Sequence, residues 1–177
     1  MNVNECITTR RSIRKYKPDP VDHSLIESIV SMASYSPSWK ITQITRYIAI
    51  DDSSILKKIA DDCTPVYNSN IIQQSPMLIA VTFIKEGAVL NVTVLILQKK
   101  EDRWQSSIQE LPVTFCLAAK EKGLGTVIMG IFDEDKITEL LEIPEERELA
   151  ALIAVGWPDI DPEVPKRKSV DDLLQFR

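Results

Sequence analysis

The chain has 177 residues, 44% of them hydrophobic and 27% charged, with a net charge of −5. This length suits a single domain with a real core, and no apolar run approaches the ~20 residues that span a bilayer. Three widely spaced cysteines and a single histidine argue against a disulfide scaffold and exclude a His-rich metal site. The polar, acidic start of the chain lacks a secretory signal pattern, so we expect a cytoplasmic protein with no membrane partner.

In the first half of the chain, apolar residues recur at helical or strand spacing between polar and proline-containing loops. Asn and Asp stand where helices should begin, because their side chains accept hydrogen bonds from free backbone amides. Residues 61–70 are polar and should form a loop. The predicted elements are a helix at 3–9 capped by Asn4, a helix from Asp22 to Ala33, a strand at 46–50, a helix at 53–60 capped within Asp51-Asp52-Ser53, and a short helix around Ile71.

In the second half, the run Met77–Ile84 is almost continuously apolar and has strand length, which predicts a buried central strand. Residues 85–105 give no clear pattern, although 89–97 could be a strand. Strands alternating with helices predict an α plus β domain with one central sheet. The other predicted elements are a helix at 111–122 with Gly123 as left-handed C-cap, an extended segment at 125–132, a helix after Asp133 that Pro144 ends, a strand at 149–155 and a short helix capped by Ser169.

Positive charge is concentrated in one stretch, Arg10–Lys17, which holds five of the 21 Lys and Arg residues of this acidic chain. A nucleic-acid surface or a targeting signal is a poor explanation, because the rest of the chain is acidic and aromatic residues are few. A solvated, charged helix end is an open alternative. A discrete phosphate fits better, because the arginine fork matches phosphate oxygens and Ser12 adds a hydroxyl donor.

Several motifs, spread in order along the chain, resemble those of the nitroreductase family, whose members use FMN to reduce nitro groups and quinones. The resemblance implies an α+β, three-layer fold in which helices flank a central mixed or antiparallel sheet. It also implies one domain over residues 1–177 and an intertwined homodimer that exchanges an extended C-terminal arm of about 158–177. The motifs are Arg10-Arg11-Ser12-Ile13-Arg14, 37–43, 117–132, 154–158 and 165–169.

The resemblance further implies an FMN site at the interface between two subunits. The basic stretch and the tail would hold the phosphate and the polar edge of the ring, and a loop would come from the other subunit. A strand end would lie against the isoalloxazine, where a backbone amide would donate to N5. The residues carried over are Arg10, Arg11, Ser12, Arg14, Lys166 and Arg167, the loop residues Pro37, Ser38, Trp39 and Ile41, and the strand residues Ile128, Met129 and Gly130.

The sequence departs from the family pattern in two places. Ile41 stands where the family usually has asparagine, and its side chain can make no hydrogen bond to a flavin. Residues 106–112 replace an Asp-containing, small-residue helix start. We therefore expect weaker flavin binding and altered substrate access. A core position beside the following strand is the alternative interpretation of Ile41.

The resemblance implies an NAD(P)H-dependent oxidoreductase that reduces nitroaromatics, quinones or a similar acceptor through FMN by a ping-pong mechanism. One alternative is a flavin-binding member with little turnover, which would store flavin or be a degenerate enzyme. A flavin-free acidic partner protein is a third possibility. A redox flavin requires neither a nucleophile nor a metal, and the sequence offers no convincing candidate for either. No GxGxxG fingerprint is present to distinguish NADH from NADPH.

Overall fold

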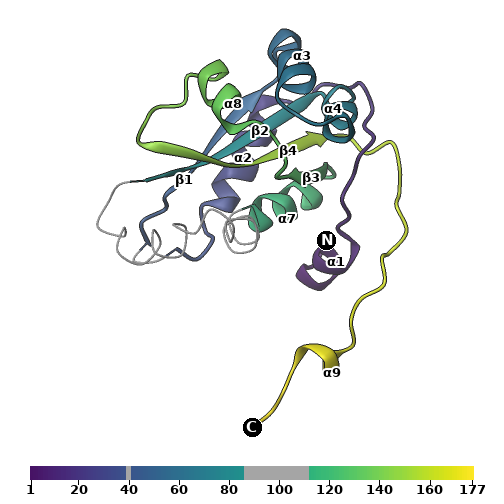
Figure 1. Ribbon diagram of the computed structural model, residues 1–177. Helices are drawn as coiled ribbons and strands as arrows, with labels where there is room; N and C mark the ends of the chain where they lie inside the picture. The colour runs from purple at the N-terminus through teal and green to yellow at the C-terminus, as the bar shows by residue number, and fades with distance from the viewer. Residues whose placement is uncertain (39–40, 86–111) are drawn as a thin grey trace.

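The computed structural model describes residues 1–38, 41–85 and 112–177, which form three layers, a sheet between two groups of helices (Figure 1). Trp39, the possible strand at 89–97 and residues 106–111 of the altered stretch lie outside the described residues. The described helices are α1 (Val3–Thr9), α2 (His23–Ala33), α3 (Ser53–Asp62), α4 (Val66–Ile72), α7 (Val113–Glu121), α8 (Glu134–Leu140) and α9 (Val170–Leu173), and the strands are β1 (Thr45–Ile50), β2 (Met77–Ile84), β3 (Gly125–Met129) and β4 (Arg147–Gly156).

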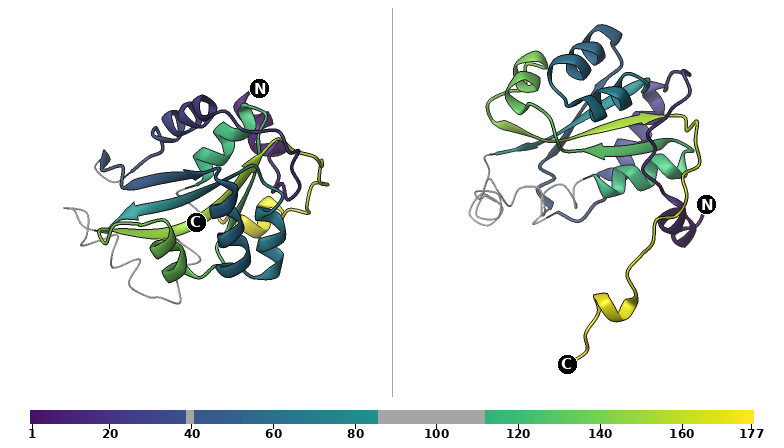
Figure 2. Two further views of the ribbon diagram at one scale, coloured as in Figure 1. Left: turned by 90° about the horizontal axis from the view of Figure 1, so that it is seen from above. Right: turned by 45° about the vertical axis from the view of Figure 1, so that its right-hand side comes forward.

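The four described strands form an antiparallel sheet in the order β1-β2-β4-β3. Helices α3, α4 and α8 cover one face, and α2 and α7 cover the other (Figure 2). Successive residues of β2 therefore enter opposite cores, with Leu78 on the α3 side and Ile79 on the α2 side. Burial on both faces explains why this strand reads as a continuous apolar run, and it confirms the predicted central strand and the three-layer α+β class.

Most of the predicted helix signals hold in the structure. Asp22, Asp52 and Asp133 each accept backbone amides at the start of their helices. Ser169 forms a capping box with Asp172 at the start of α9. Gly123 follows α7 with φ of +85°, the left-handed conformation expected of a C-cap glycine.

Three of the differences from the sequence predictions have a clear physical reason. The N-cap of α1 is Asn2 rather than Asn4, because Asn2 Oδ1 accepts the amide of Glu5 at 2.9 Å. Residues 61–70 are only partly a loop, since α4 begins at Val66. Its N-cap is Pro65, which offers no side-chain hydrogen bond and therefore leaves no capping signal in the sequence.

The third difference is the end of β3, which stops at Met129 rather than at residue 132. Beyond the strand the chain turns toward α8, and the amide of Asp133 donates to the carbonyl of Cys63 at 2.7 Å. Asn68 donates to the Ile131 carbonyl at 2.9 Å from the neighbouring helix. These contacts with the α3–α4 region give the backbone after Met129 partners outside the sheet.

Candidate functional site

The basic segment, defined as Arg10–Lys17, is mostly extended: it meets the outer edge of β3 at Ser12 and continues across the end of the sheet to Pro158, just after β4. Arg10 is the C-cap of α1, and from Arg11 onward the chain is no longer helical. Ser12 forms a parallel bridge with Thr126, and the Ile13 amide donates to the Thr126 carbonyl at 3.0 Å. The alternative of a charged helix end is therefore wrong for most of the segment.

Beyond this bridge, the outer edge of β3 carries backbone groups that no other described strand pairs with. The Thr126 carbonyl points outward, to Ile13, so period-two alternation directs the backbone groups of Ile128 outward as well. Met129 instead faces β4 with its backbone, and its side chain is buried in the core. Gly130 follows directly after the strand. This edge can donate and accept hydrogen bonds with a planar polar ligand.

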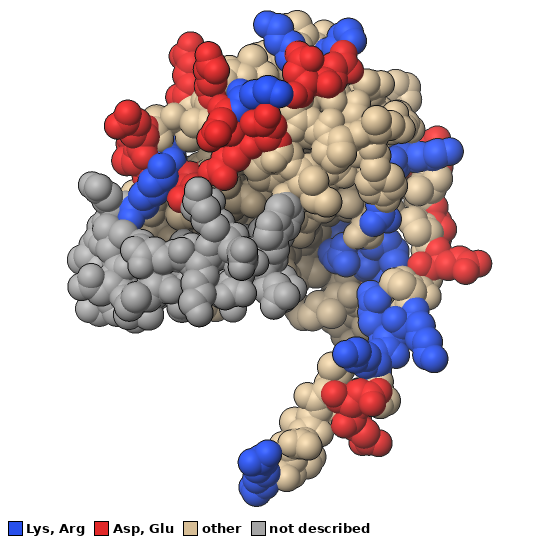
Figure 3. Space-filling model, viewed as in Figure 1, with Lys and Arg blue, Asp and Glu red and all other residues tan. Residues whose placement is uncertain are grey.

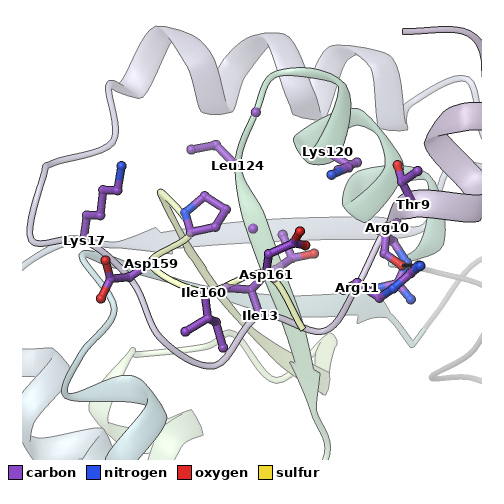
Figure 4. A pocket seen from close by; sticks show the side chains of 14 residues that line it. Thr9, Arg10, Arg11, Ile13, Lys17, Lys120, Leu124, Asp159, Ile160 and Asp161 are labelled. Carbon is purple, nitrogen blue, oxygen red and sulfur yellow. Dashed lines mark hydrogen bonds between the residues drawn. The ribbon is translucent and has the colours of Figure 1, made fainter. Parts of the chain in front are cut away.

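A cavity of about 470 Å³ opens beside the basic segment (Figure 4). Arg10, Arg11 and Lys120 lie at one end of it, and Lys17 and Asp159 lie at the other (Figure 4). Together with Asp161, the lining carries four basic side chains against two carboxylates. An excess of positive charge in a concave site favours an anionic ligand.

The arginines of the segment keep donors for such a ligand. Arg11 donates to the carbonyl oxygens of Thr8 at 2.7 Å and Arg10 at 2.8 Å, both from Nη1. Arg14 is exposed and donates to the Ser12 carbonyl at 3.4 Å. Because a guanidinium has five N–H donors, each of these side chains has donors left over for phosphate oxygens.

The surface around this segment is basic, although the chain as a whole is acidic. Lys and Arg side chains gather where α1 and the C-terminal tail leave the body, and Asp and Glu crowd the region of α8 (Figure 3). Lys166 and Arg167 lie in the extended, exposed tail. The tail leads away from the body of the chain (Figure 2).

The loop of Pro37, Ser38 and Ile41 lies at the other end of the sheet. Thr45, just after it, pairs through β2 with the start of β4, whereas the basic segment meets Pro158, just after the end of β4. At the rise of a β-strand, the two ends are roughly 25–30 Å apart. One chain therefore brings Arg10, Arg11 and Ser12 to the edge of β3 but leaves this loop far from them.

Ile41 is not a core residue of this chain, because 81% of its surface is exposed. Its φ is +58°, in the left-handed region that is a genuine outlier for a β-branched residue and that asparagine adopts more readily. The turn is held by Gln43, whose amide donates to Ser38 Oγ at 3.2 Å and whose side chain donates to the Ser34 carbonyl at 3.0 Å. The interpretation of Ile41 as a core residue is therefore wrong. Ile41 lies in an exposed loop with a strained, left-handed backbone.

Other kinds of site are weaker. Burial raises the pKa of the Cys116 thiol, against the opposing effects of a hydrogen bond with Thr126 and the charge of Arg10, so it stays protonated as the buried small hydrophobe that the sequence indicates. Across residues 1–38, 41–85 and 112–177, no group of three His, Cys, Asp or Glu side chains is placed to hold a metal ion. None of the described helices is long and apolar enough to cross a membrane.

Two residues that line the cavity, Lys120 and Thr126, give no local sequence signal of a site. Lys120 stands in the last turn of a hydrophobic helix, where a cation is explained by the helix dipole alone. Thr126 reads as one more β-branched strand residue. Only the packing of α7 and β3 against the basic segment brings them to the cavity.

The chain is similar to known proteins over most of its length. Residues 7–157 match the sequence model of the Nitroreductase family. A 5,6-dimethylbenzimidazole synthase of Rhodospirillum rubrum is 25% identical and aligns over 89% of this chain and 82% of its own length. A protein of Methanothermobacter thermautotrophicus, provisionally named NADH dehydrogenase/NAD(P)H nitroreductase, is 30% identical over 92% of this chain and 80% of its own.

Solved structures show the same fold. A nitroreductase family protein from Streptococcus pneumoniae superposes with a TM-score of 0.80 at 20% identity, covering 99% of this chain and 100% of that one. An FMN-dependent nitroreductase from Clostridium difficile superposes with a TM-score of 0.73 at 24% identity, covering 98% of each chain. The family match spans most of the chain, including the basic segment, the edge of β3 and the loop of Ile41, and the chain belongs to the nitroreductase family.

Proposed function

We propose that this protein is an FMN-dependent oxidoreductase that uses NAD(P)H to reduce a nitroaromatic, a quinone or a similar small acceptor. The observation that carries the proposal is the basic segment fixed beside the edge of β3, which puts an anion site next to backbone groups that no described strand pairs with. The names of relatives support it, since they include NAD(P)H nitroreductases and an FMN-dependent nitroreductase.

The described residues fit the chemical parts of FMN. Its phosphate needs cations and N–H donors. Arg10 and Arg11 supply them in the lining of the cavity. Ser12 and the exposed Arg14 belong to the same segment but do not line the cavity, and we propose that they add a hydroxyl and a guanidinium. The polar edge of its ring needs backbone hydrogen bonds, which the outer edge of β3 at Ile128 and the adjoining Gly130 can provide. When bound, FMN would take up a hydride from NAD(P)H and pass the electrons to an acceptor in a separate step, which is the basis of ping-pong kinetics.

The residues of the chain would bind and orient the cofactor rather than exchange protons with it. The cations fix the phosphate end, so the ring is held at a constant distance from that anchor. Hydrogen bonds from the edge of β3 would then fix the ring's orientation against the protein. Binding and orienting the cofactor in this way requires no nucleophile, in accord with the protonated, buried Cys116.

We also propose that a second copy of the chain completes the site. The loop residues Pro37, Ser38 and Ile41 cannot approach the basic segment of their own chain, because the length of the sheet separates them. A C₂ dimer presents the same surfaces of both copies to one another and can bring the loop of one beside the basic segment of the other. Lys166 and Arg167, on the arm of about 158–177, would close on the phosphate.

The strained position of Ile41 supports a second candidate, a flavin-binding protein with little turnover. An exposed isoleucine in a left-handed turn offers no side-chain hydrogen bond where asparagine could give one. Losing such a bond weakens binding without removing the phosphate site. The two candidates differ in whether bound flavin reacts with NAD(P)H.

The test uses the purified full chain. FMN is titrated by fluorescence, and the complex is mixed with NADH or NADPH without oxygen, then with a quinone or a nitroarene. The enzyme proposal predicts bleaching of the flavin absorbance followed by its recovery. Flavin that binds but does not bleach with either nucleotide supports the second candidate, and a chain that binds no FMN contradicts both.

A further inference from the structure

Tyr16 is a buried residue of the basic segment that carries no charge. Its hydroxyl lies 2.6 Å from the Ile13 carbonyl oxygen and 3.1 Å from the Ala154 carbonyl oxygen of β4. The residue is only 7% exposed and belongs to the core on the α3 side of the sheet. Desolvation raises the pKa of Tyr16 above its ordinary value, so the hydroxyl remains a donor at neutral pH.

The bond to Ile13 fixes the backbone between two proposed phosphate ligands. The Ile13 amide is already held by the Thr126 carbonyl at 3.0 Å, and its carbonyl is held by Tyr16. Ser12 and Arg14 flank this residue on either side. Because both backbone groups of Ile13 are satisfied by the sheet and by Tyr16, the peptide planes that carry Ser12 and Arg14 have little freedom to rotate.

Two glycines let this part of the segment lie directly on the end of the sheet. Gly125 and Gly156 are register partners on β3 and β4. A Cβ atom at Gly125 would lie 2.7 Å from Cγ1 of Ile13, and one at Gly156 would lie 2.9 Å from Cδ1 of Tyr16. Such contacts are too close for a side chain, so the glycine pair forms the floor on which Ile13 and Tyr16 pack.

We infer that Tyr16 is a positioning residue that holds the Ser12–Arg14 backbone in the conformation that binds the phosphate of FMN. The inference rests on the proposed function, and it assigns Tyr16 no contact with the cofactor. The hydroxyl acts through the Ile13 carbonyl. Its loss should therefore affect the phosphate end of the ligand and spare the ring.

The test is Tyr16→Phe in the full chain, with FMN and riboflavin as the two ligands. Riboflavin has the same ring and ribityl chain but no phosphate. One lost hydrogen bond should weaken FMN binding by roughly threefold to tenfold and leave riboflavin binding unchanged. Equal weakening of both ligands, or no weakening of either, would overturn the positioning role.

Tyr47→Phe is the control, because Tyr47 is a partly buried tyrosine, with a pKa raised by burial to about 12, and lies on β1, far from the segment. Its FMN-to-riboflavin affinity ratio should equal that of the wild type. Gly125→Ala is a second variant with the same expected direction as Tyr16→Phe, since its methyl group would press on Ile13. A normal ratio in Gly125→Ala would also count against the inference.

Hydrogen exchange separates this inference from the proposed function, because it needs no ligand. Tyr16→Phe should accelerate exchange of the Ile13 amide in the apo protein, while Tyr47→Phe should not. Unchanged exchange would show that the hydroxyl does not hold the segment, whatever the protein binds. If the wild type binds no FMN but Tyr16→Phe still accelerates exchange of the Ile13 amide, the proposed function is wrong and the role of Tyr16 in holding the segment remains.

Discussion

Ile41 shows how a single backbone conformation can change the interpretation of a substitution. In the sequence it is a hydrophobic residue where the family usually has asparagine, and it could lie either at the flavin site or in the hydrophobic core. In the structure it is exposed and left-handed, so neither burial nor a hydrogen bond explains an isoleucine there. The residue costs backbone strain at a loop that we assign to the flavin site.

The first prediction is that Ile41→Asn stabilises the apo protein. A left-handed conformation costs an L-residue roughly 1–2 kcal/mol, and asparagine tolerates it better, so we expect a gain of about 1 kcal/mol in the free energy of unfolding. Thermal and denaturant unfolding of the apo protein measure this gain. Because the side chain is exposed, the new amide finds water and adds no burial cost.

The controls for this prediction separate strain from ligand contact. Ile41→Val keeps a β-branched side chain and should leave stability unchanged, whereas Ile41→Gly should relieve the strain but add no donor. FMN should bind more tightly to the Asn variant than to the Gly variant if position 41 faces the flavin. An Asn variant less stable than the wild type would mean that the turn is not left-handed in solution.

The second prediction concerns the arginines of the basic segment. Arg10→Ala or Arg14→Ala should weaken FMN binding by one charge-assisted hydrogen bond, about 1.5–3 kcal/mol, and leave the melting temperature of the apo protein nearly unchanged. Lys15→Ala is the control, because Lys15 is an exposed cation of the same segment to which we assign no contact with the phosphate. Equal losses in all three variants would indicate only a general charge effect.

At the scale of the elements, local chemistry predicts helices better than it predicts the site. The caps Asp22, Asp52 and Asp133 were predictable because a short polar side chain directly precedes an amphipathic run. The start of α4 was not, because Pro65 caps it without a side-chain hydrogen bond. A helix start is therefore predictable where a neighbouring side chain caps it, and not where the cap offers no side-chain hydrogen bond.

The elements of the site are brought together by distant pairing, which the sequence does not display. Charge alone marked the basic segment, and the family resemblance supplied its role. Neither indicated that Ser12 bridges Thr126 or that Lys120 lines the same cavity. These contacts join residues more than a hundred positions apart, so they depend on the order of strands and on the path across the sheet end.

The third prediction concerns a contact between the start of α2 and the residue that follows β1. His23 Nε2 and Asp51 Oδ2 lie 2.6 Å apart there. The hydrogen bond to Asp51, and then its charge, raises the pKa of His23 above its ordinary value of 6.5. The protonated pair therefore stabilises the fold fully below pH 6.5, and this contribution is lost as the pH rises through the raised value.

Melting temperatures of the wild type and Asp51→Asn across this range test the pH prediction. The wild type should be slightly more stable below pH 6.5, and the difference should vanish at alkaline pH. The effect should be small, because both side chains are largely exposed to water. A difference that grows with rising pH would have the wrong sign for this pair.

At the scale of the whole molecule, the described chain has the parts of a site but not a closed one. The basic segment lies at one end of the sheet and the loop of Ile41 at the other. The arm extends from the body with apolar side chains in solvent, Leu173 being 70% exposed and Phe176 90% exposed. Exposed apolar residues on an extended arm favour burial against another protein surface, and a second copy of the chain would provide that surface.

The shared site is tested most directly by the number of FMN molecules bound to mixed dimers. One subunit carries Arg10→Ala and Arg14→Ala, and the other carries Ser38→Trp, with different tags for purification. Both parent homodimers should fail to bind FMN at a concentration that fills the wild type. In the mixed dimer one site then holds every substitution and the other holds none, so a shared site predicts one FMN per dimer. A mixed dimer that binds no FMN would show that each site is built from a single chain and would contradict the account.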